Sequence, residues 1–142
     1  CEAMLEPCGD GWRLPVSVSP RVVGRTLRVW GANSSYQLAV LHALARAVLQ
    51  AADLLNVDAA DRPRWRNLLR GLPPGALGEG PELLLWDDFP PAESYPHHGH
   101  LSALYPLDLL DPLGNETHRQ LIRNSLRRLT SLGTGQWSAG SF

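Results

Sequence analysis

The chain has 142 residues, of which 44% are apolar and 19% are charged, a balance that excludes a disordered chain and predicts a buried core. Thirteen basic residues oppose fourteen acidic ones, so the formal net charge is −1. Nucleic acids and anionic membranes attract strongly basic surfaces, and we therefore expect neither as a partner.

The residues of this sequence contain no recognisable targeting or membrane-spanning segment. No basic stretch followed by an apolar one opens the chain, and the longest apolar stretch, 38–49, is interrupted by His42 and Arg46. We therefore expect no signal peptide in these residues and no bilayer span. N-glycosylation sequons at Asn33 and Asn115 fit a secretory route.

The first predicted helix follows an extended lead-in. Residues 1–34 lack a helical period, and Leu14–Pro20 alternates apolar with polar residues, so we expect loop and short strand there. From Ser35, the expected N-cap, apolar residues recur at spacings of three and four, which predicts a long helix with one buried stripe. The stripe comprises Leu38, Leu41, Leu44, Ala45, Val48, Leu49, Ala52 and Leu55.

A second helix is predicted over 62–70, with Asp61 as its N-cap and Gly71 just past its end. Because the short connection 56–60 joins the two helices, residues 35–71 are expected to form a helical hairpin. The expected buried face of the second helix comprises Trp65, Leu68 and Leu69.

Residues 72–115 are expected to form a long loop rich in proline and histidine. Six prolines fall within 73–96, where no long helix can persist. A brief helix over 101–105 is expected to stop near Pro106. Long loops in compact proteins tend to carry function, so we expect the candidate site here.

The last predicted helix covers 116–132, with Asn115 or Thr117 as its cap, and a tail over 133–142 follows it. The sequence has no internal repeat at a solenoid period. Helices joined by long loops therefore predict an all-α chain built from helical hairpins, and we interpret 1–142 as a single segment.

Three histidines, His97, His98 and His100, form the densest polar cluster of the loop. Imidazoles bind zinc and copper, but a tetrahedral site needs four ligands, and the cysteines Cys1 and Cys8 lie far away in the sequence. We therefore predict no metal site. The alternatives are hydrogen bonding to a polar ligand such as a sugar and a solvated loop without a ligand.

The segment His98–Leu107 resembles the His-Arg-His-x-Ser-His-Leu-Tyr-x-Leu signature of glycoside hydrolase family 95, which includes α-L-fucosidases and α-L-galactosidases. Other motifs occur in the order typical of the family, so the resemblance runs from about Val16 to Ser138. These motifs are Ser19-Pro20, Leu55-Asn56-Val57-Asp58, Leu72-Pro73-Pro74, Leu85-Trp86-Asp87-Asp88 and Thr134-Gly135-Gln136-Trp137-Ser138.

This resemblance implies part of an (α/α)6 barrel, the six-hairpin glycosidase fold, with the sugar site at one end. It implies action on terminal α-L-fucosyl or related sugars of glycans by inverting hydrolysis, which needs a carboxylic acid for the leaving group and a base for the attacking water. The implied partner is a carbohydrate with a terminal deoxy- or L-sugar, and no cofactor is expected. The implied sugar contacts are His98, His100, Tyr105, Trp86 and Trp137.

The catalytic acid of the family is missing from its expected position. Arg21 stands there, and no Asp or Glu occurs between Asp10 and Asp53. A guanidinium stays protonated and cannot serve as a general acid. These residues also lack the downstream acidic motif of the family. We interpret the chain as a fragment or divergent member of the glycosidase family, with a non-catalytic carbohydrate-binding or scaffold descendant as the alternative. The carboxylates nearest to the histidine cluster are expected to form a solvated acidic loop: Asp87, Asp88 and Glu93.

Overall fold

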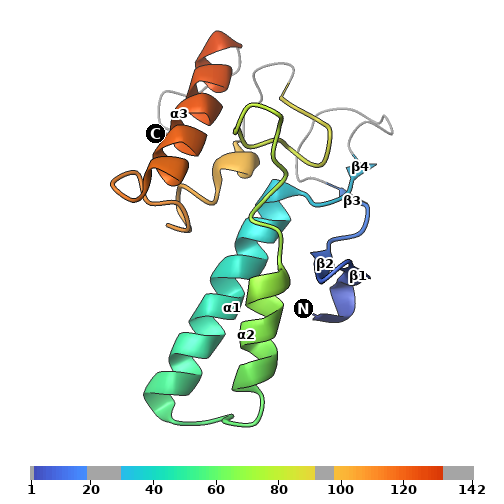
Figure 1. Ribbon diagram of the computed structural model, residues 1–142, viewed down its shortest axis with the longest axis vertical. Coiled ribbons are helices and arrows are strands. Elements are labelled where there is room, and N and C mark those ends of the chain that lie inside the picture. The colour runs from blue at the N-terminus through green and yellow to red at the C-terminus, as the bar shows by residue number, and fades with distance from the viewer. Residues whose placement is uncertain (1, 19–29, 92–97, 133–142) are drawn as a thin grey trace.

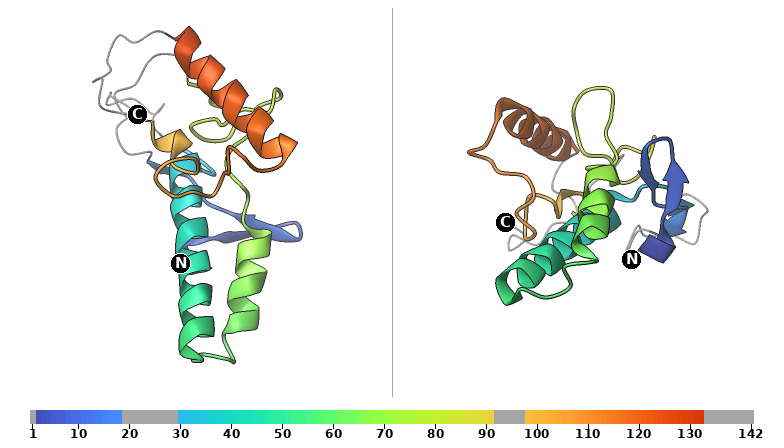
Figure 2. Two further views of the ribbon diagram at one scale, coloured as in Figure 1. Left: turned by 90° about the vertical axis from the view of Figure 1, so that its left-hand side faces the viewer. Right: turned by 60° about the horizontal axis from the view of Figure 1, so that its bottom comes forward.

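The computed structural model describes residues 2–18, 30–91 and 98–132, and this part of the chain is mostly helical. Helices α1 (Ser35–Leu55) and α2 (Arg62–Gly71) lie side by side as a hairpin, and α3 (Glu116–Ser131) lies near the N-terminal end of α1 (Figures 1 and 2). The short elements are the 3-10 helices η1 (Glu2–Met4) and η3 (Gly99–Leu101) and the strands β1 (Glu6–Cys8), β2 (Gly11–Arg13), β3 (Ser17–Val18) and β4 (Trp30–Gly31).

The N-terminal segment forms two small antiparallel sheets beside the helices, within the range where the sequence predicts loop and short strand. Strand β1 pairs with β2, and β3 pairs with β4. Extended segments must satisfy their backbone groups, and pairing with a second extended segment does so. Strand β2 packs closely on the end of α2, because a Cβ built on Gly11 would lie 2.7 Å from the carbonyl oxygen of Gly71. Gly71 is the last residue of α2, not the residue after it as predicted.

The ends of α1 are set by contacts distant in sequence as well as by local pattern. The N-cap is Ser34, one residue before the predicted cap. Ser35 is the first residue of α1, and its hydroxyl accepts a hydrogen bond from the backbone N–H of Ala76 at 2.9 Å. At the other end, Asn56 adopts the left-handed conformation (φ 52°) that commonly ends helices. The Arg62 guanidinium then donates to two backbone carbonyls around this turn at 2.7 and 2.8 Å, which closes the hairpin.

The predicted apolar stripe of α1 is buried only along part of its width. Leu38 and Leu41 are buried, whereas Leu44, Val48 and Leu55 are 45%, 37% and 71% exposed. Helix α2 covers one side of α1 (Figure 2), strand β2 contacts α2, and the stripe is wider than the surface that α2 offers. The core on the covered side consists of Leu5, Leu14, Leu38, Leu41, Leu68 and Leu72, with Trp12 packed against it.

Helix α1 is also long and apolar enough to cross a membrane, with 21 residues and a mean hydropathy of 1.5 in its most apolar window. This test rests on length and composition, and the core helices of soluble proteins pass it too. The prediction that no segment spans a bilayer therefore stays a prediction.

Helix α3 matches the predicted range to within one residue, and Asn115 is its N-cap, since its Oδ1 accepts a hydrogen bond from the backbone N–H of His118 at 2.9 Å. The brief helix expected over 101–105 is instead the earlier and shorter η3, followed by turns. The second core cluster joins these elements and consists of Leu83, Leu101, Leu121 and Leu129, with Leu110 and Leu126 packed against it.

The Ser125 hydroxyl holds α3 against the loop that follows α2. It donates to the carbonyl of Leu121 at 2.8 Å and accepts from the backbone N–H of Leu83 at 2.9 Å. Both contacts are buried. Because this hydroxyl is the partner of a buried backbone donor, its removal leaves that donor unsatisfied.

Ser125→Ala is therefore expected to lower the free energy of unfolding by about 1–3 kcal/mol, the cost of a buried unpaired N–H. Ser131→Ala is the matched control, because its exposed hydroxyl bonds only the carbonyl of Arg128 one turn earlier. Urea titration of both variants measures the difference. Equal stabilities would contradict the role assigned to Ser125.

Candidate functional site

Three chain segments meet at the N-terminal end of α1 and form the candidate site. The backbone N–H of Ser35 donates to the carbonyl of Leu85 at 3.1 Å, and the N–H of Asp87 donates to the carbonyl of Ala32 at 3.1 Å. Helix η3 lies against the same end of α1, where a Cβ built on Gly99 would come within 3.5 Å of the Tyr36 ring (Figure 1). We call this junction of residues 31–36, 85–89 and 98–101 the N-terminal corner.

Asn33 is the residue that connects these segments through its side chain. Its Oδ1 accepts from the backbone N–H of Leu14 at 2.9 Å, and its Nδ2 donates to the carboxylate of Asp87 at 2.8 Å. Its backbone is left-handed (φ 52°), a conformation that Asn adopts more readily than most residues. The expectation of a solvated acidic loop is therefore wrong for Asp87, which is half-buried and hydrogen-bonded. Asp88 is exposed, and Glu93 lies outside the described residues.

Trp86 is the buried aromatic residue of the corner. It is 4% exposed, and its ring stacks on Phe89 with centroids 4.5 Å apart and planes 12° from parallel. The indole also covers the Cα of Gly31, because a Cβ built there would lie 2.0 Å from Trp86 Cδ1. Trp86 was predicted to contact sugar, and the structure places its side chain in the interior.

His98 is the N-cap of η3 and His100 lies within it, and their ring centroids are 6.2 Å apart in an edge-on arrangement. His98 is half-buried, and His100 is 4% exposed. Burial, together with charge repulsion from the neighbouring His98, lowers the pKa of His100 to about 4. The His100 imidazole is therefore neutral at pH 7. Among the described residues, its buried Nδ1 has no hydrogen-bond partner.

Of the two remaining predicted sugar contacts, only Tyr105 lies within the described residues. Tyr105 follows η3 and is 75% exposed. Trp137, like Arg21 at the expected acid position and His97 of the histidine cluster, lies outside the described residues. Sequence reasoning missed Asn33, Gly31 and Ser34, whose buried hydroxyl also lacks a partner among the described residues. The only signal for them was their position immediately before a strongly predicted helix.

The corner can bind polar ligands but offers few groups for acid–base chemistry. A neutral imidazole both donates and accepts hydrogen bonds, as sugar hydroxyls require. Asp87 contributes the carboxylate closest to the corner, and Asn33 holds one of its oxygens. Across the described part of the chain, no group of three or more His, Cys, Asp or Glu side chains is placed to hold a metal ion.

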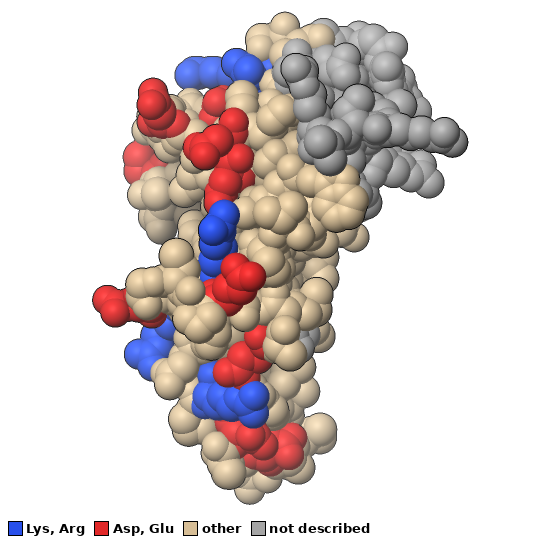
Figure 3. All heavy atoms as spheres, turned by 90° about the vertical axis from the view of Figure 1, so that its right-hand side faces the viewer, with Lys and Arg blue, Asp and Glu red and all other residues tan. Residues whose placement is uncertain are grey.

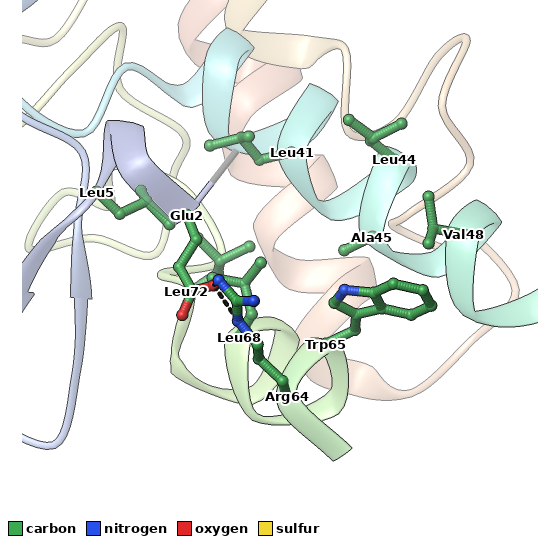
Figure 4. Close-up of a pocket in the computed structure, with 10 residues that line it drawn as sticks. All are labelled: Glu2, Leu5, Leu41, Leu44, Ala45, Val48, Arg64, Trp65, Leu68 and Leu72. Atoms are coloured by element: carbon green, nitrogen blue, oxygen red, sulfur yellow. Dashed lines mark hydrogen bonds and ion pairs between the residues drawn. The ribbon is translucent and has the colours of Figure 1, made fainter. Parts of the chain in front are cut away.

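A separate hollow of about 270 Å³ lies between α1, α2 and η1 (Figure 4). Its walls are mainly apolar, and an ion pair between Arg64 and Glu2 lies at one side. Sugar sites need several convergent polar groups, which this hollow lacks, so we place the candidate site at the corner. The residues that line the hollow are Glu2, Leu5, Leu41, Leu44, Ala45, Val48, Arg64, Trp65, Leu68 and Leu72.

Charge on the molecular surface is mixed. On the face shown in Figure 3, arginine side chains alternate with acidic ones, and neither sign forms a broad patch among the described residues. Several charges of the described residues are paired, such as Arg62 and Arg66 with Asp53, and Arg119 with Glu116. This face therefore offers no electrostatic attraction for a strongly charged ligand.

A comparison with known protein families shows to which family the chain belongs. The model described as the glycosyl hydrolase family 95 catalytic domain matches residues 13–141. The chain belongs to glycosyl hydrolase family 95. No curated protein sequence matches it.

This family 95 membership confirms the resemblance noted for the segment His98–Leu107. The matched range includes all three described α-helices, η3 and the whole N-terminal corner, and it leaves η1 and β1 outside. Because glycoside hydrolases act on carbohydrates, membership in family 95 also implies a carbohydrate substrate. The corner of this family 95 chain is therefore considered below as a sugar site.

The first prediction from the corner concerns pH. His100 has a folded pKa near 4 against about 6.5 for a free imidazole, so protonation favours the unfolded chain. The stability that neutral His100 contributes is complete above pH 6.5 and is lost as the pH falls toward 4, by roughly 3 kcal/mol. Unfolding free energies of His100→Gln should fall less steeply in this window than those of the native chain.

His118→Gln is the control for this experiment, because it removes a histidine of α3 that lies outside the N-terminal corner. His42, whose pKa burial also lowers, contributes equally to all three proteins. Identical slopes for His100→Gln and the native chain would contradict the assignment of a buried neutral imidazole.

The second prediction concerns the contact between Gly31 and Trp86. Gly31→Ala places a methyl group inside the indole ring and should destabilise the fold by about 2 kcal/mol or more, as overpacked sites do. Gly80→Ala is the control, because nothing lies within 4 Å of a Cβ at that position. Chemical denaturation compares the two. A Gly31→Ala protein as stable as Gly80→Ala would show that Trp86 does not pack on this backbone.

Proposed function

We propose that this family 95 chain binds the terminal α-L-fucosyl unit, or a related deoxy- or L-sugar, of a glycan at its N-terminal corner. The observation that carries the proposal is the buried Nδ1 of His100, which has no partner among the described residues. Buried polar atoms in folded proteins are nearly always hydrogen-bonded, so an atom without a partner supports a ligand at that place. His100 also belongs to the signature that resembles the family motif.

The chemistry of the corner supports a neutral polyhydroxylated ligand. His100 is neutral at pH 7, and His98 lies beside it, so two imidazoles can exchange hydrogen bonds with adjacent hydroxyls. His100 is only 4% exposed, so hydrogen bonds to its imidazole would be made away from bulk water. Hydrogen bonds made away from water are stronger than those in solution, which favours selective sugar binding. We keep Tyr105 and Trp137 as further proposed contacts.

We also propose that the hairpin of α1 and α2 is one unit of an (α/α)6 barrel, with residues 1–142 as a single segment of that domain. Leu44, Val48 and Leu55 support this arrangement, because a ring of hairpins would bury an apolar face that α2 leaves uncovered. In such a barrel the whole domain would hydrolyse the glycosidic bond with inversion.

Arg21 favours a second candidate function, a non-catalytic carbohydrate-binding or scaffold descendant. Inverting hydrolysis needs a carboxylic acid to protonate the leaving oxygen, and a guanidinium cannot replace it. Of the carboxylates around the corner, Asp87 is held by Asn33, and Asp88 is exposed. We therefore expect the chain to bind sugar without turning it over.

The test is a glycan array and calorimetric titration with L-fucose, run beside hydrolysis assays on aryl α-L-fucoside and aryl α-L-galactoside. The native chain should bind L-fucose, and His118→Gln should bind it as the native chain does. His100→Gln should bind at least about tenfold more weakly, because it loses one good hydrogen bond. Neither aryl glycoside should be hydrolysed.

Each other outcome contradicts part of the proposal. Unchanged binding by His100→Gln would remove this imidazole from the site. Hydrolysis of either aryl glycoside by the native chain would show that a residue other than Arg21 supplies the catalytic acid. Binding to no glycan at all would favour the scaffold function over the sugar-binding one.

A further inference from the structure

The sequence contains two N-glycosylation sequons, and the structure places them in opposite environments. One is Asn33-Ser34-Ser35, and the other is Asn115-Glu116-Thr117. An attached oligosaccharide is compatible with the folded protein only where the asparagine Nδ2 is free and has open space around it. The two asparagines differ on both counts.

Asn33 cannot carry a glycan in the folded chain. Its Nδ2 donates to Asp87 at 2.8 Å, and its Oδ1 accepts from the backbone N–H of Leu14 at 2.9 Å, so both ends of the amide are engaged. The next two residues of the sequon, Ser34 and Ser35, are 1% and 2% exposed. An oligosaccharide on this amide would have to displace the segments that the amide holds together.

Asn115 is open on its Nδ2 side. It is exposed at the start of α3, and its Oδ1 accepts from the backbone N–H of His118 at 2.9 Å as the helix cap. Its Nδ2 makes no hydrogen bond within the described ranges. Glu116 and Thr117 are exposed too, and the loop before α3 lies at the periphery of the molecule (Figure 2).

We propose that Asn115 is the N-glycosylation site of this protein and that Asn33 stays unmodified. The donor is a polyprenyl-pyrophosphate-linked oligosaccharide of the secretory pathway. A bond forms between Nδ2 and the anomeric carbon, the bond from that carbon to the pyrophosphate oxygen breaks, and the pyrophosphate leaves with the electron pair. The amide nitrogen gives up one of its two protons.

This reaction is compatible with the fold at Asn115 because it leaves Oδ1 untouched. The cap to His118 therefore survives, and the stability of α3 should not change through loss of the cap. The glycan would also lie beside Leu113, which is 88% exposed, and would cover apolar surface that otherwise faces water.

The experiment expresses the full chain in a secretory eukaryotic host and compares Thr117→Ala with Thr117→Ser. Thr117→Ala removes the sequon and keeps the Asn115 cap, whereas Thr117→Ser preserves the sequon. The native chain and Thr117→Ser should lose mass on treatment with peptide-N-glycosidase, and Thr117→Ala should not. Treatment in ¹⁸O-water converts each glycosylated asparagine to labelled aspartate, and the label should appear at residue 115 alone.

Label at residue 33 in the folded protein would overturn the proposal, as would the absence of amidase-sensitive mass from the native chain. Retention of the glycan by Thr117→Ala would also overturn it. Unglycosylated Thr117→Ala from a bacterial host should unfold at the same urea concentration as the native chain, so its missing glycan reflects the sequon and not misfolding.

Discussion

The structure depends on the two side-chain hydrogen bonds of Asn33. One amide group accepts from the backbone of Leu14 and donates to the carboxylate of Asp87, so it joins the N-terminal strands, the start of α1 and the loop that follows α2. These segments come from distant parts of the sequence, and the left-handed backbone of Asn33 directs the chain into α1 at this point. The corner exists because one residue satisfies all three of these requirements.

The same corner accounts for the residues that surround it. Trp86 packs on Gly31 and Phe89, and η3, which carries the buried His100, lies against the same end of α1. Burial keeps the His100 imidazole neutral at pH 7, and its Nδ1 has no hydrogen-bond partner among the described residues. A neutral imidazole suits the sugar hydroxyl that we propose as its ligand and not an ion.

Local sequence patterns predicted the helices but largely did not predict which elements pack against them. The spacing of apolar residues predicted α2 and α3 to within one residue, and Asn115 caps α3 through its side chain, because these signals act within a turn or two. The exposure of Leu44 was not predictable, since it depends on which elements pack against α1.

The candidate site shows the same division between local and tertiary information. The motif around His98 and His100 was visible in the sequence and lies within the range that matches family 95, and the structure joins it to α1. The role of Asp87 required knowledge of Asn33, which lies 54 residues earlier, and no local rule relates them.

The central claim, a sugar-binding corner built around His100, is tested most directly by NMR. The chain is labelled on its histidine and tryptophan side chains and titrated with L-fucose. We expect the His100 imidazole signals to shift and saturate, while those of His118 and of Trp65 in the apolar hollow stay in place. Signals of His100 that do not move, or shifts centred on Trp65, would contradict the account.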